Sequence, residues 1–201
     1  MHQNHSTEAI KTVLFIPGFE ETIDSRDYRA TMRAIESRGY NVVFVPISWS
    51  RKTIDDWVVE FGHEYAQYDP ADTILAGFSF GATTAFVAAT HRQPVEVWLF
   101  SLSPYFAEDF VSKNMKKSWV THIGHRRADA FRRLSFAKLQ AKINAPTILF
   151  YGQNEIDKWP VMAERAYDAK RRMRYARFVA IPDVGHDIAD PAYIQAIVEH
   201  I

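Results

Sequence analysis

Residues 73–90 constrain the fold of this chain more than any other stretch. Residues 73–76 form a short apolar run that begins with β-branched side chains, which predicts a buried strand. The motif Gly-Phe-Ser-Phe-Gly follows at 77–81, and the Ala-rich run 82–90 is long enough for a helix that packs on a sheet. In a strand–turn–helix this motif is typical of a nucleophile elbow, because glycines without Cβ atoms allow the tight turn that strains Ser79. The alternative is a glycine-rich turn with an ordinary surface serine.

Strands and helices alternate along the rest of the chain. Unbroken apolar runs predict further strands at 12–16, 41–45, 95–100, 147–151 and 176–181. Apolar residues at helical spacing, bounded by glycine or proline, predict helices at about 25–38, 54–65, 82–91, 161–173 and 190–201. This alternation predicts an α/β protein, a three-layer α/β/α sandwich with a mostly parallel sheet of about six strands.

The predicted domain organisation is simple. Residues 1–10 are polar, and we expect them to form a disordered leader. Residues 11–201 then form a single domain, since a chain of 201 residues is long enough for one substantial core. Residues 105–142 differ from the rest because they carry more charge and show only weak helical patterning, so we interpret them as an insertion.

Composition excludes several classes of protein. Lys+Arg and Asp+Glu are both 24, and this balance does not favour a nucleic-acid partner. The absence of cysteine excludes disulfides, thiolate metal sites and a cysteine nucleophile. No apolar run indicates a signal peptide or a membrane span, so we expect a cytoplasmic protein. His122 and His125 lack nearby carboxylates, and we expect neither a metal nor a cofactor.

Together the motif and the strand order resemble the α/β-hydrolase superfamily over nearly the whole chain. That family carries its catalytic residues in the order serine, acid, histidine. The resemblance implies Ser79 as nucleophile and His186 as the base that takes and returns its proton. His186 follows a glycine in the loop 183–187, directly after the last predicted strand. Asp183 and Asp187, on either side of it, are interpreted as residues that shape this loop.

The acid is predicted from the segment that follows the strand at 147–151. Spacing in the family places the acid three residues after Gly152, which selects Glu155. Asp is the commoner residue in this role, and Asp157 is only two positions further along. Either carboxylate has the chemistry to orient the imidazole and stabilise its charged form. We favour Glu155 and keep Asp157 as the alternative.

The resemblance also implies an oxyanion hole made by two backbone N–H groups. One is the amide of Phe80, directly after the nucleophile, and the other is the amide of Phe19 in the loop after the first strand. The family often has His-Gly in this loop, whereas this chain has Pro17-Gly18. The difference is mild because the donor is a backbone group.

The insertion and nearby aromatic residues are expected to form the substrate pocket. The family places its cap where residues 105–142 lie, and a segment this short can form only a small lid. The aromatic residues predicted to line the pocket are Phe78, Tyr105, Phe106 and Trp159. The insertion is rich in Lys and Arg, and we interpret these cations as a solvated helix face rather than an anion-binding lid.

Together, the motif, the resemblance and the expected pocket predict a serine hydrolase. It would cleave carboxylic esters or thioesters of a small-molecule acyl substrate through an acyl-enzyme on Ser79. An amidase or peptidase would use the same residues. A protein of a different class, a non-catalytic binding protein that retains the fold, is the other alternative. The oligomeric state stays open.

Overall fold

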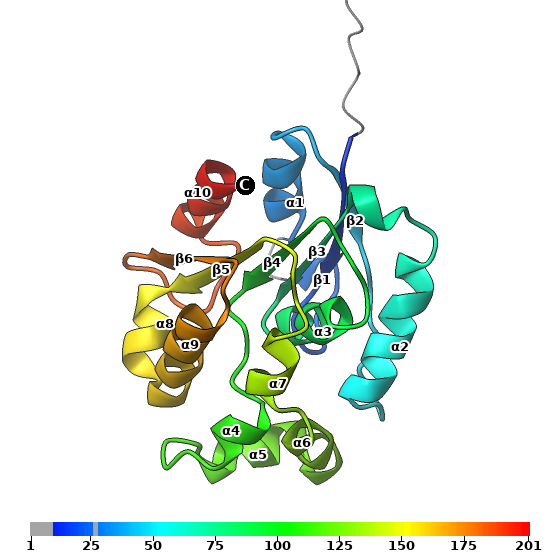
Figure 1. The fold of residues 1–201 in the computed structure, drawn as a ribbon. Coiled ribbons are helices and arrows are strands. Elements are labelled where there is room, and N and C mark those ends of the chain that lie inside the picture. The colour runs from blue at the N-terminus through cyan, green and yellow to red at the C-terminus, as the bar shows by residue number, and fades with distance from the viewer. Residues whose placement is uncertain (1–9, 26–27) are drawn as a thin grey trace, which may run out of the picture.

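The computed structural model describes residues 10–25 and 28–201 and contains a six-stranded sheet in the order β2-β1-β3-β4-β5-β6. Every neighbouring pair is parallel. The strands are β1 (Thr12–Ile16), β2 (Asn41–Phe44), β3 (Thr73–Phe78), β4 (Glu96–Phe100), β5 (Thr147–Gly152) and β6 (Ala176–Ile181). Figure 1 shows this sheet between two layers of helices. The predicted three-layer α/β/α architecture is confirmed.

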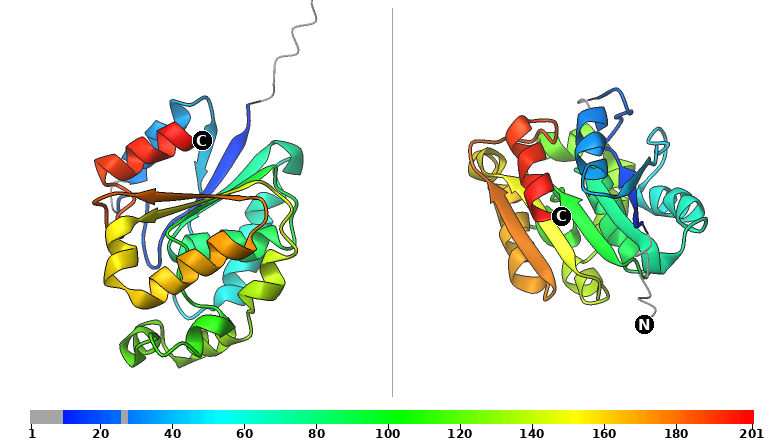
Figure 2. Two further views of the ribbon diagram at one scale, coloured as in Figure 1. Left: turned by 60° about the vertical axis from the view of Figure 1, so that its left-hand side comes forward. Right: turned by 90° about the horizontal axis from the view of Figure 1, so that it is seen from above.

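Helices cover the two faces of the sheet unequally. The helices α1 (Tyr28–Glu36) and α10 (Pro191–His200) lie together on one face. The opposite face is covered by α2 (Ile54–Tyr65), α3 (Phe80–Ala89) and α9 (Pro160–Arg172). Figure 2 shows the two layers from the side and from above. Parallel strands need such cover on both sides, since each crossover helix packs back on the sheet.

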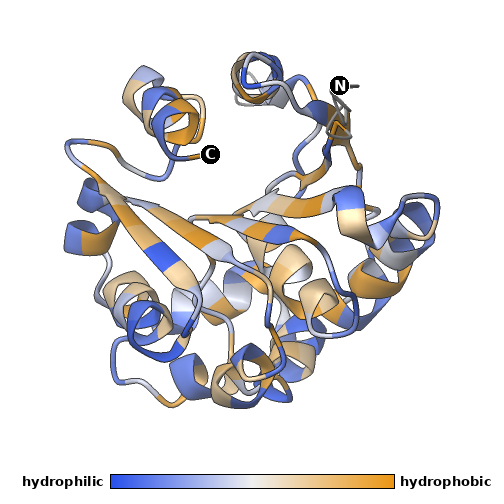
Figure 3. Ribbon diagram, turned by 45° about the horizontal axis from the view of Figure 1, so that its top comes forward, coloured by the Kyte–Doolittle hydropathy of each residue, from blue (hydrophilic) through white to orange (hydrophobic). Residues whose placement is uncertain are grey.

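Two hydrophobic clusters result from the alternation of side chains along the strands. In β1, Val13 and Phe15 point to the cluster under α1 and α10, whereas Leu14 and Ile16 point to the cluster under α2 and α3. All residues of β3 and β5 are buried. Figure 3 shows the strands mostly in the colours of hydrophobic residues.

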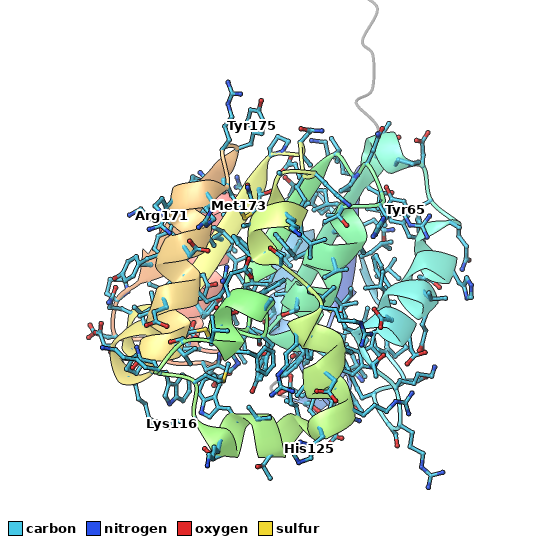
Figure 4. The ribbon with its side chains drawn as sticks, turned by 60° about the horizontal axis from the view of Figure 1, so that its bottom comes forward. Tyr65, Lys116, His125, Arg171, Met173 and Tyr175 are labelled. Carbon is cyan, nitrogen blue, oxygen red and sulfur yellow. The ribbon has the colours of Figure 1, made fainter. Side chains whose placement is uncertain are left out.

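The segment 105–142 contains four short helices and is called the cap below. These helices are α4 (Ala107–Phe110), α5 (Lys117–Ile123), α6 (His125–Arg132) and α7 (Phe136–Gln140). In Figure 1, α4, α5 and α6 lie together at the bottom and α7 lies between them and α3, and Figure 4 shows Lys116 and His125 at the two ends of α5. The sequence predicted an insertion here but not where its helices begin and end.

Other departures from the predicted elements are small. The predicted strands begin and end within about two residues of the observed ones. The segment after β5, for which no helix was predicted, forms the helix α8 (Gln153–Lys158), and a 3-10 turn (Pro70–Asp72) precedes β3. Most of the predicted disordered leader, residues 1–9, lies outside the described residues. Across the described ranges, no helix is long and apolar enough to cross a membrane.

Candidate active site

Ser79 stands at a sharp turn between β3 and α3. Its backbone has φ 57° and ψ −116°, a conformation that costs energy for a residue with a side chain. A Cβ atom on Gly77 would overlap the carbonyl group of Gly81, and one on Gly81 would overlap the carbonyl oxygen of Ile16. Both glycines are therefore required for the turn, as the elbow motif implies. The turn places the Ser79 hydroxyl at the carboxyl edge of the sheet.

The loop after β6 brings His186 to this hydroxyl. Its Nε2 atom lies 3.1 Å from Ser79 Oγ, and its Nδ1 atom lies 2.6 Å from Glu155 Oε2. When Nδ1 carries the proton and donates it to Glu155, Nε2 has a free lone pair that can accept the Ser79 proton. The His186 side chain is 19% exposed and the Glu155 side chain 0% exposed, so the chain of hydrogen bonds runs from the cavity wall into the interior.

Glu155 is held by two further donors. Its Oε1 atom accepts a hydrogen bond of 2.8 Å from the backbone N–H of Gly152 and one of 2.6 Å from the hydroxyl of Ser101. A Cβ atom on Gly152 would overlap the backbone of the histidine loop, so this glycine allows the close approach of β5 and that loop. With both oxygens engaged, the carboxylate is fixed in orientation against the imidazole.

The other candidate carboxylates lie elsewhere. Asp157 is exposed on α8, where it accepts a hydrogen bond of 2.7 Å from Gln153. Asp187 accepts a hydrogen bond of 3.1 Å from the backbone N–H of Ala189, and Asp183 has a positive φ of 60°. The geometry thus brings Glu155 to His186 and leaves Asp157 at the surface.

The two amides expected to form an oxyanion hole belong to adjacent segments. The ring centroids of Phe19 and Phe80 are 5.3 Å apart, and the carbonyls of the loop before Phe19 lie against Gly81. The intervening N–H of Gly18 donates to the hydroxyl of Tyr28 at 2.9 Å. Within the described part of the chain, the backbone N–H groups of Phe19 and Phe80 have no acceptor.

A cavity of about 270 Å³ opens beside Ser79 and His186. Its remaining lining residues come from the segment after β4, the cap and the adjoining helices: Phe80, Ser103, Pro104, Tyr105, Ser118, Trp119, His122, Trp159 and Met162. Among the described residues that line it, the ionisable side chains are those of His122, His186 and Tyr105, and burial raises the pKa of the Tyr105 phenol. The wall is therefore aromatic and largely uncharged at neutral pH.

Two of the four aromatic residues predicted for the pocket lie in it, and two do not. Tyr105 and Trp159 line the cavity. Phe78 points to the face of the sheet opposite the cavity and is buried in the cluster under α1 and α10. Its ring nevertheless contacts His186, with the two ring centroids 4.7 Å apart. Phe106 is buried against Phe86 and Phe136 beneath the cap. Contrary to the expectation, Phe78 and Phe106 do not line this cavity.

The basic residues of the cap have mixed surroundings. Arg133 pairs with Asp55 at 2.6 Å on the surface, as expected of a solvated helix face. Arg127 instead donates to three backbone carbonyls and lies over the ring of Phe19, with its guanidinium carbon 4.8 Å from the ring centroid. It therefore ties α6 to the loop before α2. Among the described residues, no group of three or more His, Cys, Asp or Glu side chains is arranged to hold a metal ion.

The fold of the chain is similar to that of several proteins of known structure. No protein-family model matches the sequence, and no curated protein does. Among solved structures, Est1E from Butyrivibrio proteoclasticus is similar with a TM-score of 0.75 and 14% identity over 98% of this chain and 87% of that one. A dienelactone hydrolase from Anabaena variabilis has a TM-score of 0.65 and 18% identity, with coverages of 96% and 84%. The thioesterase domain from the curacin biosynthetic pathway has a TM-score of 0.64 and 18% identity, with coverages of 94% and 90%. The chain has the α/β-hydrolase fold.

Two serines of this α/β-hydrolase fold were missed by the sequence analysis. Ser101 and Ser103 follow β4 at the same edge of the sheet as the elbow, and their hydroxyls contact Glu155 and Ser79. The Ser101 hydroxyl also lies 3.1 Å from the hydroxyl of Tyr193. Their place directly after a predicted strand could have indicated them, because the carboxyl ends of neighbouring parallel strands lie at the same edge of the sheet.

Proposed function

We propose that this protein is a serine hydrolase that cleaves carboxylic esters or thioesters through an acyl-enzyme on Ser79. The observation that carries the proposal is the unbroken line of hydrogen bonds from Glu155 through His186 to Ser79, with separations of 2.6 and 3.1 Å. A buried carboxylate, an oriented imidazole and a strained serine beside a cavity are the parts that acyl transfer requires.

In the proposed acylation, His186 Nε2 takes the proton of Ser79 as Oγ attacks the carbonyl carbon. Glu155 remains ionised and stabilises the imidazolium that forms. The backbone N–H groups of Phe19 and Phe80 donate to the carbonyl oxygen, which becomes negative in the tetrahedral intermediate. His186 then gives the proton to the oxygen or sulfur of the leaving group as its bond to the acyl carbon breaks.

In the proposed deacylation, His186 takes a proton from a water molecule that attacks the ester carbonyl on Ser79. The bond between the acyl carbon and Ser79 Oγ breaks, and the imidazolium returns the proton to Oγ. The products are a carboxylic acid and the free serine. Ser79 thus changes from nucleophile to leaving group between the two halves of the cycle, whereas His186 acts as base and then as acid in both.

The cavity supports a small or medium uncharged acyl group as substrate. Its volume of about 270 Å³ lies just below the usual range for sites that hold drug-sized ligands. The aromatic rings of Tyr105, Trp119 and Trp159 offer flat apolar surfaces. Among the structural neighbours, Est1E is described with bound ferulic acid, an aromatic acid, which agrees with such a pocket.

Labelling with a fluorophosphonate tests the nucleophile. We expect the intact mass of the wild-type protein to increase by one adduct, whereas Ser79→Ala remains unlabelled and His186→Ala labels at least ~10³-fold more slowly. A panel of p-nitrophenyl esters, acyl thioesters and anilides then separates esterase from amidase activity. A folded wild-type protein without an adduct would overturn the proposal in favour of a non-catalytic binding protein.

A further inference from the structure

The segment Ser101-Leu102-Ser103 contacts both ends of the line of hydrogen bonds described above. Ser101 Oγ lies 2.6 Å from Glu155 Oε1, and Ser103 Oγ lies 3.2 Å from Ser79 Oγ. Ser103 is 3% exposed and forms part of the cavity wall beside the nucleophile. The mechanism above uses neither the Ser103 hydroxyl nor its contact with Ser79.

Backbone hydrogen bonds hold this segment in place. The N–H of Ser101, which has a positive φ of 53°, donates to the carbonyl of Phe150 at 2.7 Å. The carbonyl of Leu102 accepts a hydrogen bond of 3.1 Å from the buried hydroxyl of Tyr151, and that of Ser103 accepts one of 3.0 Å from the N–H of Tyr105. The Ser103 hydroxyl is therefore presented to Ser79 by a fixed backbone.

Ser79 has only one hydroxyl proton, and this determines which serine donates the hydrogen bond between Ser79 and Ser103. A serine hydroxyl has one proton and two lone pairs. In the reactive arrangement the Ser79 proton points to His186 Nε2, at 3.1 Å. Ser79 then has only lone pairs to offer to Ser103, so the Ser103 hydroxyl must be the donor.

We propose that Ser103 is a further catalytic residue, whose hydroxyl donates a hydrogen bond to Ser79 Oγ and stabilises the negative charge that develops on this atom. This inference rests on the proposed hydrolase function. Negative charge grows on Oγ as its proton moves to His186 during attack, and again when Oγ leaves the acyl carbon in deacylation. A hydrogen bond to a charged acceptor is about twice as strong as one to a neutral acceptor, so the contact favours the transition states over the resting enzyme.

The role is distinct from that of the oxyanion hole. The amides of Phe19 and Phe80 serve the carbonyl oxygen of the substrate, whereas Ser103 serves the attacking and departing oxygen of the enzyme. Ser103 keeps its own proton throughout and forms no covalent bond. Both groups of donors are already in place before the substrate binds, which is how preorganised donors lower a barrier.

Three variants test the proposal: Ser103→Ala, Ser103→Cys and the control Ser37→Ala. Ser103→Ala removes the donor, whereas Ser103→Cys fills the space but donates only weakly. Ser37 is an exposed serine directly after α1, away from this cavity, and its hydroxyl donates a hydrogen bond of 2.6 Å to the carbonyl of Ala34. The measurements are the rate of fluorophosphonate labelling and the kcat and KM for a neutral p-nitrophenyl ester.

We expect both Ser103 variants to lower the labelling rate and kcat by about 10- to 100-fold with little change in KM, as for one hydrogen bond to a developing charge. Ser37→Ala should stay within about threefold of wild type in kcat. The acid limb of the pH profile of kcat/KM should keep its midpoint in Ser103→Ala, because the pair of His186 and Glu155 is untouched.

Several outcomes would overturn the inference. Wild-type rates in either Ser103 variant would show that the hydroxyl only fills space. A shifted midpoint in the pH profile would show that the substitution moved the whole segment, with Ser101 and Glu155, and that the loss is structural. Failure of the wild-type protein to label would overturn the hydrolase function itself, whereas a labelled wild type with an equally fast Ser103→Ala overturns this inference alone.

Discussion

The sheet and the cap both contribute to the candidate active site, but different interactions hold them in place. Ser79, Glu155 and His186 lie directly after β3, β5 and β6, and the parallel ladder between these strands fixes their separation. The cap supplies Trp119 and other parts of the cavity wall from short helices that share no ladder with the core. Backbone hydrogen bonds between strands thus position Ser79, Glu155 and His186, whereas side-chain contacts position the cap.

Two carboxylates on α4, the buried Asp109 and the half-buried Glu108, anchor the cap. Asp109 accepts hydrogen bonds from Arg165 on α9, the shortest at 2.9 Å, and one of 2.8 Å from the N–H of Phe106. The Arg165 guanidinium also lies over the ring of Phe136, 4.0 Å from its centroid. Glu108 accepts from the hydroxyl of Ser135 at 2.6 Å and from the N–H of Phe136 at 2.9 Å, at the start of α7. We therefore expect substitutions at the ends of the core strands to lower turnover, and substitutions on α4 to lower the stability of the fold.

The largest expected effect concerns the acid in the core. Glu155→Ala should lower kcat by at least ~10³-fold, because His186 then loses the partner that orients it and stabilises its charge. Asp157→Ala, on the exposed face of the same helix, is the matched control and should retain nearly full kcat. Steady-state kinetics on an ester substrate measures both. A large loss in Asp157→Ala with a small one in Glu155→Ala would assign the acid to Asp157.

The buried ion pair of the cap should affect stability more than chemistry. Burial raises the pKa of the Asp109 carboxyl, although the Arg165 guanidinium acts in the opposite direction, so desolvation dominates. Asp109→Ala leaves Asp168, at 3.4 Å, as the remaining acidic partner of the guanidinium among the described residues, and it should cost about 3 kcal/mol in the free energy of unfolding. Urea unfolding measures this loss, and KM should rise more than kcat falls.

A double variant and a surface control sharpen this second test. Asp109→Asn with Arg165→Met removes both charges and should recover most of the lost stability, because no uncompensated charge stays buried. Arg171 lies on α9, as Arg165 does, and is an exposed cation that pairs with Asp168. Arg171→Met should change stability by less than about 1 kcal/mol. Equal losses in Arg171→Met and Asp109→Ala would contradict the anchoring role of the buried pair.

The smallest expected effect depends on pH. Burial raises the pKa of Glu108, but the hydrogen bonds from Ser135 and from the N–H of Phe136 outweigh it, and the net pKa is lowered. A carboxyl group with a lowered folded pKa stabilises the fold above its unfolded pKa, near 4.3, and loses this contribution as pH falls through the folded value. Glu108→Gln should therefore be about 1 kcal/mol less stable than wild type at pH 7 and match it near pH 3. Thermal unfolding across this range measures the difference, and a difference independent of pH would exclude the charge as its cause.

The accuracy of the sequence analysis also differs between the two regions. The strands and long helices of the core were predicted within a few residues because runs such as 147–151 are apolar along their whole length. The cap helices α4 and α7 have only 4 and 5 residues, too short for a hydrophobic period to be recognised. Their ends are set by contacts with α9 and with each other, which the local sequence does not encode.

By itself, the sequence determined the alternation of strands and helices, the elbow at Ser79 and the order in which candidate residues follow the strands. These features depend on neighbouring residues, such as two glycines around a serine or an apolar run between turns. The tertiary structure brought Glu155 rather than Asp157 to His186, turned Phe78 away from the cavity and placed Ser103 beside Ser79. Each of these outcomes depends on atoms far apart in the chain, and only the packing of the strands and the cap brings them within hydrogen-bonding distance.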